Sequence, residues 1–165
     1  MTIGLERLLR HMAWANQRCI EHIKGLPEES LRAFVIDPEW NVSELLHHIV
    51  DSADFYVYRI TGEFPQTEGE SIAEIESVQD LELLSSQCKA IDEALLGTVT
   101  LEDEQIQFEN SSGVQVKRWR STILSQAIHH ATEHRAQIAA ALDAKGFQRL
   151  DLDEMDLWRY EIDKG

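Results

Sequence analysis

Apolar residues recur at intervals of three and four positions along four long stretches of this 165-residue chain, and this spacing limits the folds open to it. An α-helix turns by about 100° per residue, so such spacing gathers apolar side chains on one face. We predict helices near 3–24, 42–61, 78–96 and 121–145. Amphipathic helices of this length bury their apolar faces against one another. The pattern therefore predicts an all-α fold, a four-helix bundle.

The ends of these stretches carry residues that start and stop helices. Asn41 and Glu44 resemble a capping box before the second stretch, and Ser77 and Asp80 resemble one before the third. A glycine falls just past each stretch, where the left-handed conformation can close a helix. These glycines are Gly25, Gly62, Gly97 and Gly146. The capping signals thus support the four predicted helices.

A short segment between the third and fourth predicted helices follows a different period. Apolar and polar residues alternate over 105–109 and again over 114–117, on either side of the turn sequence Asn110-Ser111-Ser112-Gly113. Alternation with a period of two around such a turn is typical of a β-hairpin. A lone hairpin is marginal in water, so we expect this one to pack on the bundle.

Composition and charge narrow the class of protein. The apolar fraction is 43%, which is enough for one hydrophobic core, and we expect a single domain over 1–165. Lysine and arginine total 15 against 30 acidic residues, a formal charge of −15. A strongly negative surface repels phosphate groups, so we expect neither nucleic-acid binding nor attachment to anionic membranes.

The chain carries no recognisable targeting or membrane signal. No stretch approaches the roughly 20 apolar residues of a membrane span, and the N-terminal residues lack the pattern of a secretory signal. We therefore expect a cytoplasmic protein. Cys19 and Cys88 lie on apolar helical faces far apart in the sequence, and we expect two buried free thiols rather than a disulfide.

Three histidines are predicted to point into the bundle. His130 and His134 are four positions apart, which on a helix is about 40° of rotation and about 6 Å of rise, so both rings can reach one ion. His48 continues the apolar stripe of the second predicted helix. Burying three imidazoles is costly, and no inward carboxylate is evident on these stripes to compensate. We predict that His48, His130 and His134 bind one divalent metal ion.

Alternatives remain open at this point. A single histidine on an apolar face is more often a hydrogen-bonded core residue than a ligand. The segment from His130 to His134 also matches the H-x-x-E-H pattern of inverted zinc proteases. Patterns as short as this one recur by chance. The other four histidines are expected to flank the site, to face solvent or to lie off the main apolar stripe of their helix. They are His11, His22, His47 and His129.

Three segments resemble the DinB/YfiT-like superfamily of small metal-binding four-helix bundles. The resemblance covers nearly the whole chain in the order of its elements. It departs from the family pattern at Ala136, where many members have glycine. The segments are Trp14-Ala15-Asn16, the stretch Trp40–Ile49, and the stretch from Gly113 through His130-x-x-x-His134-Arg135-x-Gln137-Ile138.

The resemblance implies that His48, His130 and His134 are the metal ligands and that the protein forms a homodimer. Some members of the superfamily transfer low-molecular-weight thiols, and many have no assigned reaction. Three neutral imidazoles suit Zn²⁺ or Ni²⁺, our first expectations, and leave a coordination position open for water or substrate. No catalytic residue is assigned from the sequence.

Three functions are therefore compatible with the sequence. The first is a metal-dependent enzyme that acts on small molecules, with thiol transfer as the reaction expected. The second is a metal-dependent hydrolase, which needs only water. The third is a non-enzymatic metal-binding bundle linked to stress.

Overall fold

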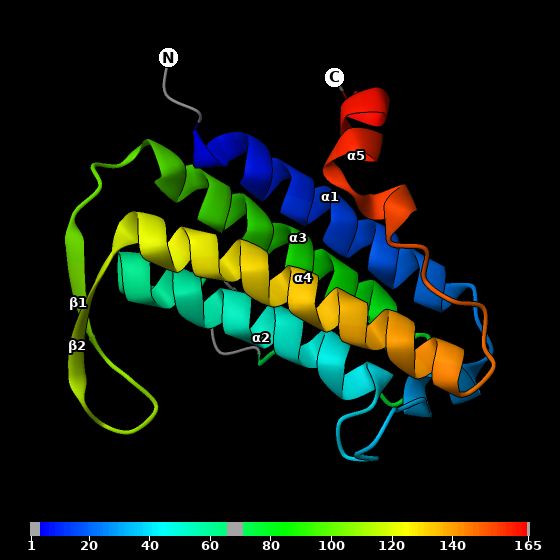
Figure 1. The fold of residues 1–165 in the computed structure, drawn as a ribbon. Coiled ribbons are helices and arrows are strands. Elements are labelled where there is room, and N and C mark those ends of the chain that lie inside the picture. The colour runs from blue at the N-terminus through cyan, green and yellow to red at the C-terminus, as the bar shows by residue number, and fades with distance from the viewer. Residues whose placement is uncertain (1–3, 66–70, 165) are drawn as a thin grey trace.

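The computed structural model describes residues 4–65 and 71–164 and contains five α-helices and one β-hairpin within them (Figure 1). The first predicted helix begins at position 3, which lies outside the described residues. The long helices otherwise lie within two residues of their predicted bounds. They are α1 (Leu5–Lys24), α2 (Val42–Thr61), α3 (Asp80–Gly97) and α4 (Arg120–Ala144). The all-α bundle predicted from the sequence is confirmed.

The four long helices form a ring in which each packs against two others. The main contacts join α2 to α4, α1 to α3, α2 to α3 and α1 to α4. Figure 1 shows that α1 and α4 run in one direction and α2 and α3 in the other. The second and fourth helices are thus antiparallel neighbours, although α3 and the hairpin separate them in the sequence. This arrangement brings the histidines of α2 and α4 to the same interface.

The bounds of α2 follow from its two caps. The Asn41 side chain accepts hydrogen bonds from the backbone N–H groups of Ser43 and Glu44, as the predicted capping box requires of its first residue. At the other end Gly62 adopts φ 81°, a left-handed conformation that disfavours a Cβ, and its N–H donates to the Tyr58 carbonyl. The helix that carries His48 is therefore fixed at both ends by local sequence.

The predicted hairpin is present as β1 (Gln105–Glu109) and β2 (Gln115–Trp119), paired antiparallel with Phe108 opposite Val116. Its strands contact α2 and α4 respectively. Ile106, Phe108 and Val116 are half-buried, whereas their polar neighbours are exposed. The expectation that the hairpin packs on the bundle is confirmed. Contact with the helices is what partly buries these apolar side chains.

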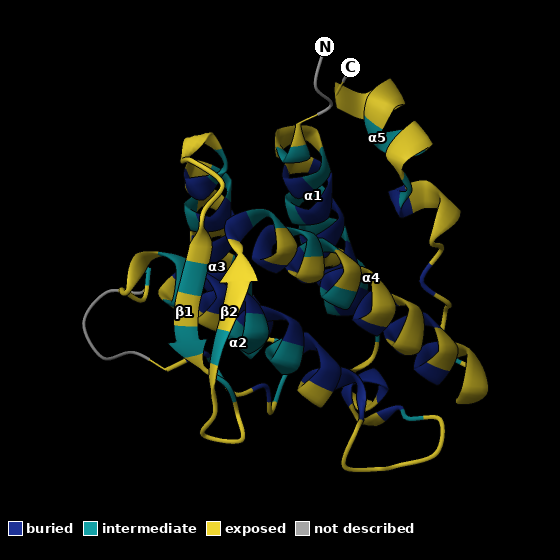
Figure 2. Ribbon diagram, turned by 60° about the vertical axis from the view of Figure 1, so that its left-hand side comes forward, coloured by how far each residue is buried: buried dark blue, intermediate teal, exposed yellow. Residues whose placement is uncertain are grey.

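The core runs the length of the bundle between the four helices, whose outer faces are exposed (Figure 2). Cys19 and Cys88 are buried free thiols, as predicted. A last helix, α5 (Leu157–Lys164), packs on α1 near the N-terminal end of the chain. None of the described helices is both long and apolar enough to cross a membrane. The largest fully buried side chains include Leu9, Met12, Ile23, Leu45, Leu84, Ile91, Ile138 and Leu142.

Candidate metal centre

The interface between α2 and α4 brings His48, His130 and His134 together, and we call them the three-histidine cluster. The Nε2 atom of His130 lies 3.1 Å from Nε2 of His48 and 3.1 Å from Nε2 of His134. One ligand nitrogen from each ring lies within 4.8 Å of the other two. The helical rotation predicted for His130 and His134, together with the inward stripe of α2, accounts for this convergence.

The spacing of these nitrogen atoms suits a small divalent ion. With metal–nitrogen bonds of about 2.0–2.1 Å, two nitrogen ligands lie about 3.3 Å apart in a tetrahedral site and about 2.9 Å apart in an octahedral one. The two separations of 3.1 Å fall between these values. The donor set, three imidazoles without a thiolate, fits zinc, nickel, iron or copper. The residues present therefore fit a divalent metal ion.

A glutamine one turn along α4 orients His134. The Nδ1 atom of His134 lies 2.8 Å from Oε1 of Gln137, and because that oxygen can only accept, Nδ1 carries the proton. The lone pair of this ring is therefore on Nε2, the atom that faces the other two histidines. The Trp40 indole N–H donates to the same oxygen at 3.4 Å, and its ring packs against His48 and His134.

The surroundings of His48 and His130 disfavour their protonated forms. Burial and the nearby His134 and His48 lower the pKa of His130 to about 4. Burial also lowers the pKa of His48, and the neighbouring His134 lowers it further. Neutral imidazoles have the free lone pair that metal coordination needs, because a protonated ring has none to offer.

The remaining histidines lie away from the cluster. His129 is exposed and His47 is half-buried, as their rotation from the ligand stripes predicted. His11 is buried, and its Nε2 donates to the Met155 carbonyl at 2.8 Å. His22 makes a similar bond to the Gln148 carbonyl. These two rings hold the C-terminal segment against α1, a role that the sequence did not indicate.

Glu133, the glutamate of the H-x-x-E-H pattern, is exposed on α4. The cluster also takes its third histidine from α2, where an inverted zinc protease uses a carboxylate ligand. The structure therefore gives no support to the protease alternative.

A buried polar network lies behind the cluster and was not predicted. Arg135, the neighbour of His134, turns into the core and donates to the Asn16 side-chain oxygen, while its Nη2 donates to Thr132. The amide nitrogen of Asn16 lies 3.2 Å from an Asp92 carboxylate oxygen, which also accepts from the Cys88 thiol. The network links α4, α1 and α3 through groups that would be costly to bury unpaired.

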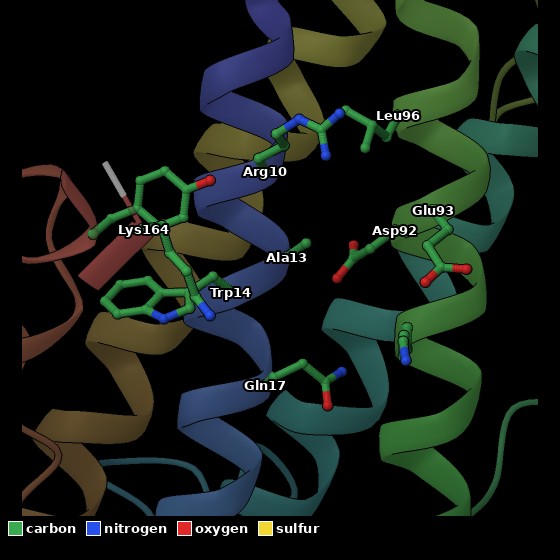
Figure 3. Close-up of a pocket in the computed structure, with 10 residues that line it drawn as sticks. Arg10, Ala13, Trp14, Gln17, Asp92, Glu93, Leu96 and Lys164 are labelled. Atoms are coloured by element: carbon green, nitrogen blue, oxygen red, sulfur yellow. The ribbon is translucent and has the colours of Figure 1, made fainter. Parts of the chain in front are cut away.

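Asp92 connects this network to a pocket of about 480 Å³ between α1, α3 and α5 (Figure 3). Figure 3 shows its carboxylate pointing toward α1, with Trp14 and Gln17 on the facing helix. Burial raises the pKa of Asp92 to about 6. No inward carboxylate was expected on the apolar stripes that carry the three histidines, but Asp54 on α2 is also buried. Neither acid was singled out from the sequence.

A second hollow, about 750 Å³, extends from His48 along the outer face of α2 to Gly62, and we call it the hairpin groove. Residues 107–111, from β1 and the turn, form its opposite wall. Because His48 belongs to both, a molecule in the groove can approach the three-histidine cluster. The groove was not predicted, since it depends on where the hairpin packs.

These features define a class of protein: a four-helix bundle in which two antiparallel helices hold a three-histidine site beside an open groove. The model of the DinB family matches residues 1–164 of this chain. Protein DinB of Bacillus subtilis (strain 168) is 25% identical over 159 residues, which cover 89% of each chain. The chain belongs to the DinB family, as the resemblance in its sequence implied.

Proposed function

We propose that this protein binds one divalent metal ion through His48, His130 and His134 and is a metal-dependent enzyme acting on small molecules. The observation that carries this proposal is the convergence of three Nε2 atoms beside an open groove. A structural site closes its coordination shell with protein ligands, whereas three ligands and an opening are typical of a catalytic site. Zinc and nickel are the ions that we expect.

Transfer of a low-molecular-weight thiol is the reaction that we propose. A divalent ion bound by three imidazoles lowers the pKa of a thiol or water at its open position. In thiol transfer the sulfur forms a bond to an electrophilic carbon, the bond from that carbon to its leaving group breaks, and the thiol proton passes to a base. Asp51 lines the hairpin groove with His48 and offers a carboxylate for that proton.

Metal content tests the first part of the proposal. We expect about one zinc or nickel per chain in the untagged protein by elemental mass spectrometry, and loss of the metal in His48→Ala and His130→Ala. His129→Ala is the matched control, because this exposed histidine adjoins His130 and lies outside the cluster. Wild-type protein without metal after incubation with zinc or nickel at neutral pH would contradict the proposal.

Turnover tests the second part. We expect the metal-loaded protein to consume a small thiol together with an electrophile from a panel of alkyl halides and epoxides, and His130→Ala to lose this activity. His129→Ala should retain it. Hydrolysis of model esters without any thiol would instead favour the hydrolase alternative. A stable metal-bound protein with neither activity would favour the non-enzymatic one.

Two further proposals are a homodimer, which the family resemblance implies, and a cytoplasmic location, which was predicted from the sequence. Sedimentation velocity of the untagged protein tests the first, and we expect about twice the chain mass of 18.9 kDa. Fractionation of the source cells tests the second, with the protein expected among the cytoplasmic proteins.

A further inference from the structure

We propose that the hairpin groove binds an anionic aromatic molecule, with the aromatic part against the exposed rings of α2 and the anion on Arg59. The inference rests on the proposed function, since it assigns a substrate class to the groove beside the three-histidine cluster. Its basis is a combination of exposed aromatic rings, one cationic side chain and direct continuity with His48.

Aromatic side chains gather along the groove and beside it. Phe55 and Tyr58 line it and are each 43% exposed, and Phe64 beside them is 44% exposed. The Tyr58 and Phe64 rings are stacked with centroids 4.4 Å apart, and Phe55 meets Phe64 edge-on at 5.6 Å. Large exposed apolar groups that contact one another mark binding surfaces more often than single ones do. Planar apolar ligands complement such rings.

Arg59 provides the charge. It is the only lysine or arginine among the described residues that line the groove. Its guanidinium carbon lies 5.0 Å from the centre of the Phe108 ring and 5.6 Å from that of Tyr56, so two aromatic rings hold it in place. Within the described parts of the chain no carboxylate lies at ion-pair distance from it. A half-buried guanidinium so held can bind a carboxylate through two parallel hydrogen bonds.

The position of Arg59 relative to the cluster sets the shape of the ligand. The Tyr56 ring lies 6.0 Å from the His130 ring and 5.6 Å from the Arg59 guanidinium carbon. The anion site and the three-histidine cluster thus share Tyr56 as a neighbour, and Arg59 and His48 line the same groove. A ligand with its carboxylate on Arg59 and a planar body along the groove therefore places its far end toward His48.

The acidic groups of the groove make Arg59 the favoured position for an anion. Asp51 lies near His48, and Glu109 lies on the hairpin, where it accepts a hydrogen bond from Gln115. These two carboxylates disfavour anions elsewhere in the groove, in a protein whose formal charge is already −15. A single negative group on the ligand is therefore directed to Arg59.

Isothermal titration calorimetry with 2-naphthoate and its uncharged analogue 2-naphthamide tests the inference. We expect the wild-type protein to bind naphthoate about tenfold more tightly than the amide, and Arg59→Gln to abolish this preference. Arg118→Gln, which removes the same charge from an exposed position on β2, is the matched control and should keep it. Phe55→Ser should weaken both ligands and leave their ratio unchanged.

Each titration is run on protein as purified and on protein treated with a chelator. In the chelated protein, ligand binding depends on the groove and not on a metal ion. A negative result for the proposed metal site is therefore distinguishable from a negative result for the groove. Equal affinity of the wild-type protein for both ligands, an unchanged preference in Arg59→Gln, or no binding of naphthoate at millimolar concentration would overturn it. If thermal unfolding shows that Arg59→Gln does not fold, Arg59→Lys replaces it and is compared with the separate variant Phe55→Ser. We then expect Arg59→Lys to reduce the preference for naphthoate over naphthamide, and Phe55→Ser to leave it unchanged.

Discussion

At the scale of single residues, Gln137 holds the His134 ring in the orientation that the proposed metal site needs. Its Oε1 accepts from Nδ1 of His134 and so keeps the lone pair on Nε2. We predict that Gln137→Ala weakens zinc binding by about 10- to 100-fold, the usual cost of losing a group that orients a ligand. Competition with a chromogenic chelator measures the affinity.

The control for Gln137 is Gln115→Ala, a change of the same kind on the exposed hairpin. It should leave the zinc affinity unchanged. Equal affinities for Gln137→Ala and the wild type would mean that helix packing alone fixes the His134 ring.

Asp92 makes stability depend on pH in the direction opposite to that of a paired carboxylate. Burial raises its pKa from 3.8 to about 6, so between these values the folded state binds a proton that the unfolded state releases. The contribution of Asp92 to the free energy of unfolding is therefore fully present below about pH 4. It is lost as the pH rises through about 6, by about 3 kcal/mol in all.

Asp92→Asn imitates the protonated form and removes this dependence. We predict that the free energy of unfolding of the wild type, minus that of Asp92→Asn, falls by about 2 kcal/mol between pH 4 and pH 7, most of the total. Urea unfolding of both proteins at each pH measures it. A difference that stays constant, or that grows with pH, would show that the Asn16 and Arg135 contacts keep Asp92 ionised throughout.

The sequence predicted the three-histidine cluster but not the network behind it, for a physical reason. His130 and His134 share one helix face by spacing alone, and His48 lies on the apolar stripe of another helix. Asn16, Asp92 and Arg135 instead belong to three different helices. Taken one at a time, each of them resembles an ordinary polar residue on a solvent-exposed helix face. Only the packing of α1, α3 and α4 makes them partners.

At the scale of elements, the start of α2 depends on one side chain. The Asn41 oxygen accepts from two backbone N–H groups and from the Ser43 hydroxyl. We predict that Asn41→Ala lowers the free energy of unfolding by about 1–2 kcal/mol. Gln79→Ala, at an N-cap position of α3 without a side-chain cap, should change it by less than about 0.5 kcal/mol. Urea denaturation compares them, and equal effects would contradict the capping role.

Elements differ in how far their positions can be predicted. The alternation around Gly113 identified the hairpin and its turn, because both signals are local. The place where Phe108 packs, against Arg59 of α2, is not local and was not predicted. The hairpin groove was missed for this reason, although each of its walls was identified separately.

At the scale of the whole molecule, the excess of acidic residues opposes the folded state. Like charges are closer together in the compact protein than in the unfolded chain. Several ion pairs between described residues join two exposed side chains, and such pairs contribute little. We predict that raising NaCl from about 20 to about 300 mM, which shortens the Debye length from about 20 to about 6 Å, raises the Tm by a few degrees.

Differential scanning fluorimetry of the untagged protein measures this effect. KCl should act like NaCl, because screening depends on ionic strength. A Tm that falls with salt would mean that the exposed ion pairs outweigh the repulsion.

The two helices that supply the histidines also determine when the site can form. His48 lies 82 residues before His130, and α3 and both strands are made between them. A chain leaving the ribosome therefore exposes one ligand long before the other two, and the full set exists only once α4 has closed the bundle. A metal ion bound by all three histidines, as proposed, would enter after this step. It would then lengthen the lifetime of the native state by slowing unfolding and would leave the folding rate unchanged.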